Sequence, residues 1–251
     1  MEDIPSQLIM NRNQTGIPLV PGSSWTMAPS GSRCIEIVKW GDKRRIIADF
    51  GASLSGDFLP PKLIDTGKTP ACHPNGVTFP ADWHITHTEN HWANESTMKA
   101  YITKVIVTYI EKIRSQLPQR HVASSQPALV IFDVFKGHMC QSTIDLFMKN
   151  NIRFVHIPPN CTYRLQPLDI LVNTPCKDFM RNKFIEWYSL KVCEVLGNTE
   201  NPSPLIDLRL STMKPLGAQW LKLFHDYIQA NPNIIKNGFR SAGITDSCSS
   251  E

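Results

Sequence analysis

The sequence lacks an uninterrupted run of about 20 apolar residues, the length that a helix needs to span a bilayer. Its first residues, Met1-Glu2-Asp3 followed by Ile4-Pro5, also lack the charged and then apolar pattern of a secretory signal peptide. The seven cysteines are scattered, odd in number and without a Cys-x-x-Cys pair, which favours free thiols in a reducing compartment. We therefore expect a soluble intracellular protein that does not bind membranes.

A strong excess of charge of one sign is also missing, because the formal net charge is only +4 over 251 residues. Such a weakly basic balance permits contact with nucleic acid but does not by itself indicate it. No internal repeat or low-complexity run is present. The length and the 41% hydrophobic content are those of one sizeable α/β domain or two small ones.

The apolar pattern predicts an alternation of strands and helices. A strand at 8–10 is expected to run into a turn at 13–16, and Pro60 and Pro61 push a doubtful strand at 59–65 toward a sheet edge. The remaining elements are strands at 34–38, 45–50, 128–132 and 153–157 and helices at 98–113, 142–150 and 176–192. Without the doubtful strand, this order is that of the ribonuclease-H-like α/β fold, a mixed sheet flanked by helices.

Three regions are expected along the chain. Residues 4–195 contain the alternating elements and form the predicted ribonuclease-H-like core. Residues 196–244 form a helical C-terminal extension, because apolar residues from Leu216 to Ile228 recur at helical spacing. Residues 245–251 resemble a frayed tail.

Two aspartates stand where an α/β sheet places ligands. Asp133 ends the apolar strand 128–132, and Asp169 follows the strand that ends at Ile157. Ligands bind at the carboxyl edge of such sheets. A single aspartate at a strand end is, however, more often a turn residue or a helix cap than a metal ligand.

Three stretches decide between these interpretations. They are 131–138 (Ile-Phe-Asp-Val-Phe-Lys-Gly-His), 158–162 (Pro-Pro-Asn-Cys-Thr) and 165–169 (Leu-Gln-Pro-Leu-Asp). Together they resemble the DDE superfamily endonuclease domain of pogo-like transposases, in the mariner superfamily, and the resemblance covers nearly the whole chain. It implies that acidic side chains hold Mg²⁺ or Mn²⁺ for DNA strand cleavage and transfer. By this resemblance Asp133 is the second catalytic metal ligand and Asp169 the third.

The first ligand departs from the family pattern. The resemblance places an aspartate where the sequence reads Asn11-Arg12-Asn13-Gln14-Thr15-Gly16, so Asn13 replaces an acidic residue with a neutral amide. Two closely spaced dications need anionic oxygen ligands, and Arg12 would oppose cation binding further if it faced the site. We therefore expect weak or absent metal occupancy and impaired catalysis.

The resemblance also implies DNA as the partner and the nucleus as the location. Lys136, His138, Arg164 and Lys177 are candidate DNA contacts, and no small-molecule cofactor is expected. Because the sequence begins almost at the first core strand, we expect it not to include the family's helix-turn-helix modules. An active metal-dependent endonuclease and a non-catalytic protein-interaction scaffold remain open alternatives, as do protein partners and a homo-oligomer.

Two further groups of residues have competing interpretations. Cys72, His73, His84, His87 and His91 could bind zinc, but they lack a paired zinc motif, and loop histidines are the favoured interpretation. The basic residues of the predicted helices are expected on solvated faces or against phosphates. They include Lys104, Lys112, Arg114, Arg120, Lys177, Arg181, Lys183 and Lys191.

Overall fold

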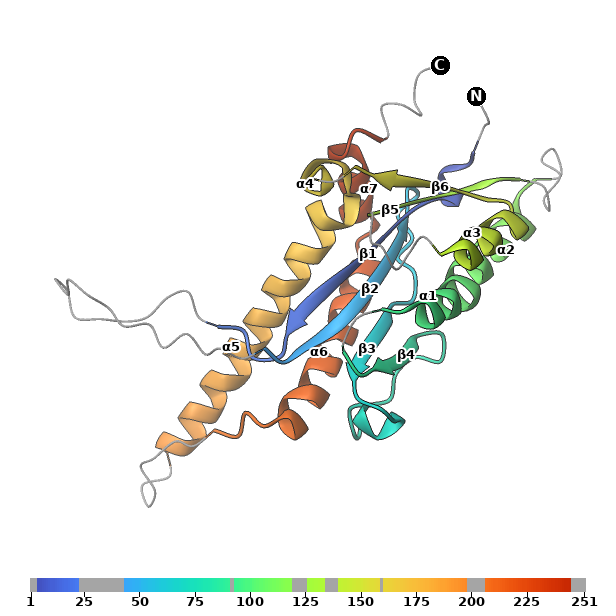
Figure 1. Ribbon diagram of the computed structural model, residues 1–251. Helices are drawn as coiled ribbons and strands as arrows, with labels where there is room; N and C mark the ends of the chain where they lie inside the picture. The colour runs from blue at the N-terminus through green and yellow to red at the C-terminus, as the bar shows by residue number, and fades with distance from the viewer. Residues whose placement is uncertain are drawn as a thin grey trace.

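A mixed β-sheet with helices on both faces forms the centre of the molecule (Figure 1). The computed structural model describes residues 4–22, 43–90, 93–118, 126–133, 140–158, 160–197 and 206–244. Six strands lie in the order β4-β3-β2-β1-β5-β6. They are β1 (Ile9–Pro18), β2 (Arg45–Ser53), β3 (Lys62–Thr66), β4 (His84–Thr88), β5 (Ala128–Asp133) and β6 (Ile152–Ile157).

Only β2 runs against its two neighbours, and the other pairs in the sheet are parallel. This arrangement confirms the predicted ribonuclease-H-like sheet. Strands β5 and β6 match the predicted apolar runs closely, and β5 pairs with the first half of β1. The carboxyl end of β5 therefore lies beside the middle of β1.

Two predictions about strands are wrong, one strand was missed, and one prediction lies outside the described residues. The turn expected at 13–16 is wrong, because β1 continues through it to Pro18 and pairs with β2 along its whole length. The edge position expected for 59–65 is also wrong: β3 begins at Lys62, after both prolines, and lies between β2 and β4. Strand β4 was not predicted, and the strand expected at 34–38 lies outside the described residues.

One continuous helical segment and a shorter helix cover one face of the sheet (Figure 1). The segment joins α1 (Glu95–Tyr101), the π-helical η3 (Ile102–Val107) and α2 (Thr108–Gln116), which confirms the helix predicted at 98–113. Asn94 caps its start by accepting a 2.9 Å hydrogen bond from the Thr97 N–H. Helix α3 (Gln141–Lys149) packs beside it through the buried Phe147.

Three long helices cover the opposite face. They are α5 (Thr174–Leu196), α6 (Leu210–Ala230) and α7 (Pro232–Ser241). Helix α6 confirms the helical stripe expected near Leu216, and its Met213, Phe224 and Ile228 are buried in the same core as Ile9 and other sheet residues. Among the described helices, none combines the length and apolar character that crossing a membrane requires.

Four short elements complete the described fold. They are η1 (Ser6–Leu8), η2 (Pro70–Cys72), α4 (Thr162–Leu165) and the π-helical η6 (Asp169–Asn173). Helix α4 and η6 together connect β6 with α5. This connection carries Asp169 and brings it to the sheet face on which α5 lies.

Candidate metal and DNA site

The pairing of β1 with β5 brings Asn13 and Asp133 to the same level of the sheet. Arg12 pairs with Phe132, and Asn13 and Asp133 are the next residue in each parallel strand. Side chains alternate between faces along a strand, so both lie on the face covered by α5 and α6. The structure thus places these two predicted site residues side by side at the end of β5.

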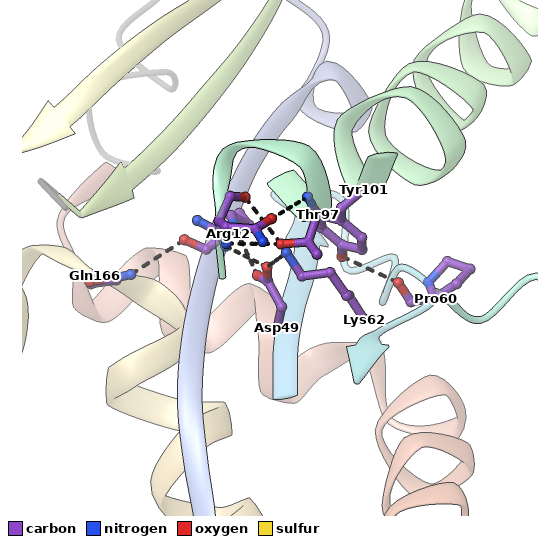
Figure 2. A network of polar contacts seen from close by, with 8 residues as sticks. Arg12, Asp49, Pro60, Lys62, Thr97, Tyr101 and Gln166 are labelled. Atoms are coloured by element: carbon purple, nitrogen blue, oxygen red, sulfur yellow. Dashed lines mark hydrogen bonds and ion pairs between the residues drawn. The ribbon is translucent and has the colours of Figure 1, made fainter. Parts of the chain in front are cut away.

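The segment before Asp169 is held against β1 by two side chains. Asn11 donates a 2.9 Å hydrogen bond to the Ile131 carbonyl oxygen and accepts one of 3.0 Å from the Leu168 N–H. The Gln166 amide donates to the Arg12 carbonyl oxygen over 3.4 Å (Figure 2). Asn11, Gln166 and Leu168 are buried, so water does not compete for these bonds.

Both acidic residues have polar neighbours from the connection between β6 and α5. The Thr162 hydroxyl lies 3.3 Å from Asp133 Oδ2, and Asn173 donates a 2.6 Å hydrogen bond to Asp169 Oδ1. Both aspartates are partly exposed, whereas Asn13 is only 8% exposed. Asp169 begins a π-helical turn, a conformation that is frequent at functional sites.

Arg12 does not face this site. Its side chain lies on the opposite face of β1, where its Nε donates a 2.6 Å bond to Asp49 and Lys62 Nζ lies 2.8 Å from the same carboxylate (Figure 2). Burial acts to raise the pKa of Asp49, but Arg12 and Lys62 outweigh it and hold that pKa below its ordinary value. Arg12 thus shares the Asp49 carboxylate with Lys62, and its guanidinium lies on the face of β1 opposite to Asn13.

The donor atoms of the three predicted site residues are of the types that suit a hard cation. Asp133 and Asp169 offer carboxylate oxygens and Asn13 offers an amide oxygen, which are the ligand types that Mg²⁺ and Mn²⁺ prefer. Two carboxylates and a neutral amide fit one divalent ion. They provide one negative charge fewer than a triad of carboxylates holding two ions.

The candidate DNA contacts divide into two groups. Arg164 on α4 is exposed and lies on the connection that carries Asp169, and Lys177 is exposed in the first turn of α5, directly after that connection. Lys136 and His138 lie outside the described residues. Tyr163, which was not predicted, is 73% exposed next to Thr162. An aromatic residue between the polar Thr162 and Arg164 was the available signal, because exposed aromatic rings stack on nucleic acid bases.

One of the basic helical residues is structural instead. Arg114 is only 9% exposed, which contradicts both a solvated and a phosphate-binding position. Its guanidinium donates to the backbone carbonyl oxygens of Gln126, Asn150 and Asn151 at 2.9, 3.0 and 3.1 Å. It ties the end of α2 to the starts of β5 and β6 because five donors in one plane can satisfy several carbonyls.

Comparisons with known proteins identify the family and the fold of the chain. The family model described as "DDE superfamily endonuclease" matches residues 43–200, which include Asp133 and Asp169 and begin after β1. "Pogo transposable element with KRAB domain" from Mus musculus is 26% identical over 96% of this chain and 36% of its own length. The Homo sapiens protein of that name is 27% identical over 70% of this chain and 27% of its own length, so the chain spans about a third of these relatives or less.

Solved structures share the fold at low sequence identity. The Mos1 mariner paired-end complex with Mn has a TM-score of 0.53 and 8% identity, over 98% of this chain and 57% of that chain. The corresponding complex with Mg has a TM-score of 0.52 and 10% identity, over 97% and 55%. Since the family model covers well over half of its residues, this chain belongs to the DDE superfamily endonuclease family and is a pogo-like transposase domain within it.

Proposed function

We propose that this chain is a transposon-derived, DNA-binding domain whose metal-dependent strand cleavage is impaired because Asn13 occupies the position of the first acidic ligand. The observation that supports this most is the alignment of Asn13 with Asp133 on neighbouring parallel strands. A ligand at Asn13 would lie at the same level as the second ligand. Strand β1 contains no acidic residue that could serve as the first metal ligand in place of Asn13.

The missing charge is large on the scale of metal affinity. A pair of unit charges 4 Å apart interacts by about 4 kcal/mol at an effective dielectric constant of 20. Since about 1.4 kcal/mol corresponds to a factor of ten in affinity, loss of even half of this attraction lowers the metal affinity more than tenfold. Asp133 and Asp169 would still hold one ion weakly, with Asn13 as a neutral third donor.

When bound, divalent ions in such sites activate a nucleophile and stabilise the leaving oxygen of a phosphodiester. The chain's own contribution to DNA binding would come from the exposed Arg164 and Lys177, whose positive charges would contact phosphates near the scissile bond. Tyr163 adds an exposed ring for stacking on an unpaired base. Phosphate contacts of this kind give affinity without sequence preference. DNA as ligand makes the nucleus the expected location.

Metal binding and plasmid cleavage test the proposal together. Calorimetric titration with MnCl₂ and supercoiled-plasmid nicking in Mg²⁺ and in Mn²⁺ are compared for the natural chain, Asn13→Asp and Asp133→Ala. We expect weak Mn²⁺ binding and little nicking by the natural chain. Asn13→Asp should raise Mn²⁺ affinity at least tenfold and produce nicking, and Asp133→Ala should abolish both.

Asn233→Asp is the matched control, because it adds the same charge at an exposed position in the first turn of α7. It should leave Mn²⁺ affinity and nicking unchanged. Nicking by the natural chain at the rate of Asn13→Asp, lost in Asp133→Ala, would show a working endonuclease and refute the impairment. A natural chain that neither nicks nor binds plasmid DNA at low salt would instead favour a protein-interaction scaffold.

A further inference from the structure

A second cluster of potential metal ligands lies away from the acidic site. Within the described part of the chain, Cys72, His73 and His87 form a group in which one ligand atom from each residue lies within 4.8 Å of the others. Cys72 ends η2, His73 follows it, and His87 lies near the end of β4. Strand β4 stands three strands from β1, and its His87 pairs with Asp65, the residue after Ile64, which is level with Gly16. The His87 backbone therefore lies roughly 20 Å from that of Asn13 at usual strand spacings.

The two histidines already have the separation that a tetrahedral ion requires. His73 Nε2 lies 3.4 Å from His87 Nδ1. Two nitrogens that each bind tetrahedral Zn²⁺ at about 2.05 Å lie about 3.3 Å apart. The rings meet edge to face, with centroids 5.2 Å apart, so the nitrogens approach each other without the rings stacking.

A carboxylate orients one of the rings. His73 Nδ1 lies 2.8 Å from Asp65 Oδ2, and Asp65 is almost fully buried. Because an ionised carboxylate only accepts hydrogen bonds, the proton of a neutral His73 ring stays on Nδ1 and the Nε2 lone pair faces His87. Metal-binding histidines commonly have a carboxylate on the other ring nitrogen, which fixes the tautomer and increases the basicity of the ligand.

The loop that carries Cys72 is held in place by close packing. Lys214 on α6 donates to the Cys72 carbonyl oxygen and lies 2.8 Å from Asp65 Oδ1. Gly67 has a φ of +157°, and a Cβ there would lie 2.5 Å from the Cys72 Cβ. The cysteine is thus positioned by tertiary contacts beside both histidines, although the sequence shows no paired zinc motif.

We propose that Cys72, His73 and His87 bind a zinc ion, with Asp65 orienting His73 from behind and solvent completing a four-coordinate site. Nitrogen and sulfur donors suit Zn²⁺ better than Mg²⁺ or Mn²⁺, so this site and the acidic site select different metals. The ion links η2 to β4 at the edge of the sheet. Its role is structural, because it cross-links the 67–73 loop to the strand.

The test uses the full chain after chelator treatment. Titration with ZnCl₂ should show one equivalent bound, and Co²⁺ in its place should give tetrahedral visible bands with a thiolate-to-cobalt charge-transfer band. Cys72→Ser should remove the charge-transfer band, and His87→Ala and Asp65→Asn should weaken zinc binding about 10–100-fold. Zinc should raise the melting temperature of the natural chain but not that of Cys72→Ser.

Controls separate this site from other thiols and from the acidic site. Cys193→Ser on the exposed part of α5, His84→Ala at the start of β4 and Asp133→Ala should all retain the cobalt spectrum. If a ligand variant does not fold, protection of Cys72 from alkylation by ZnCl₂, located by mass spectrometry in the natural chain, tests the same contact. The proposal is overturned if the natural chain shows no thiolate band, or if zinc leaves Cys72 unprotected.

Discussion

Asn11 accepts a 3.0 Å hydrogen bond from the backbone N–H of Leu168, a residue 157 positions further along the chain. The strand that carries Asn13 therefore also holds the segment that carries Asp169. The same side chain donates to the Ile131 carbonyl oxygen, two residues before Asp133. One buried amide thus connects all three predicted positions of the acidic site.

Asn11→Ala tests this connection. It leaves the Leu168 N–H and the Ile131 carbonyl buried without their partner, and each such group costs about 1–3 kcal/mol. We expect a loss of about 2–4 kcal/mol in the free energy of unfolding, measured by urea denaturation. Asn231→Ala, which removes an exposed amide bonded to the Tyr227 carbonyl, is the control and should cost under about 1 kcal/mol. Equal losses in both variants would contradict the connecting role.

Asp49→Ala should be among the most destabilising single changes in the chain. Its carboxylate lies between Arg12 and Lys62, and all three side chains are buried (Figure 2). Removing the carboxylate takes away the anion that both buried cations contact, which costs about 3–5 kcal/mol. Urea denaturation measures the loss, and Asp226→Ala on the exposed side of α6 serves as the control. A loss below about 1 kcal/mol would show that the cations find other partners.

Stability should fall steeply in acid. The pKa values of Asp49 and Asp57 lie below the ordinary 3.8. For Asp57 burial acts in the opposite direction, but hydrogen bonds from Ser55, Tyr109 and Ser53 outweigh it. The folded state therefore binds fewer protons than the unfolded chain, so this stabilisation is complete above pH 3.8 and is lost as pH falls through the folded pKa values.

Urea midpoints measured from neutral pH down to about pH 2 check this expectation. Asp57→Asn should lose less stability than the natural chain between these limits, because it lacks one of the carboxyls whose pKa is lowered in the folded state. A constant difference between the two proteins at every pH would mean that Asp57 does not contribute to the acid dependence.

Gly238 is a point of close contact between α7 and the segment before Asp169. A Cβ at Gly238 would lie 2.9 Å from the Pro167 carbonyl oxygen, a backbone atom that cannot move alone. Although alanine favours helices, we expect Gly238→Ala to lose about 1–3 kcal/mol through overpacking. Thermal or urea unfolding measures this loss. Asn237→Ala, at the exposed neighbouring position of the same helix, should be neutral or slightly stabilising. A stabilised Gly238→Ala protein would contradict the contact.

The proposed phosphate contacts and the proposed stacking contact should differ in how their loss changes the salt dependence of DNA affinity. Arg164→Ala and Lys177→Ala should weaken binding to every DNA sequence and lower the slope of log affinity against log salt by about 1 each. Tyr163→Ala should weaken single-stranded DNA binding by about 1–3 kcal/mol with little change in salt slope. Fluorescence anisotropy over a salt series measures both. Lys222→Ala on α6 is the control, and an equal effect there would indicate nonspecific charge attraction.

The order of strands and helices was predictable because it depends on local pattern. Residues 128–132 and 153–157 are short apolar runs that become β5 and β6, and the 98–113 periodicity becomes the α1-η3-α2 segment. Strand β4 was missed because its burial is partial and its histidines and threonines give no apolar alternation. The interior position of β3 was missed because Pro60 and Pro61 precede the strand instead of interrupting it.

The sequence by itself determined the family resemblance, the placement of Asp133 at a strand end and the neutral residue at Asn13. These are properties of residue identity and of neighbours along the chain. Only the tertiary structure decided which face Arg12 occupies, that Arg114 is buried, and that Cys72 meets His87. Each of these depends on strand register or on contacts between distant segments, and a one-residue change of register would reverse the face of every side chain in a strand.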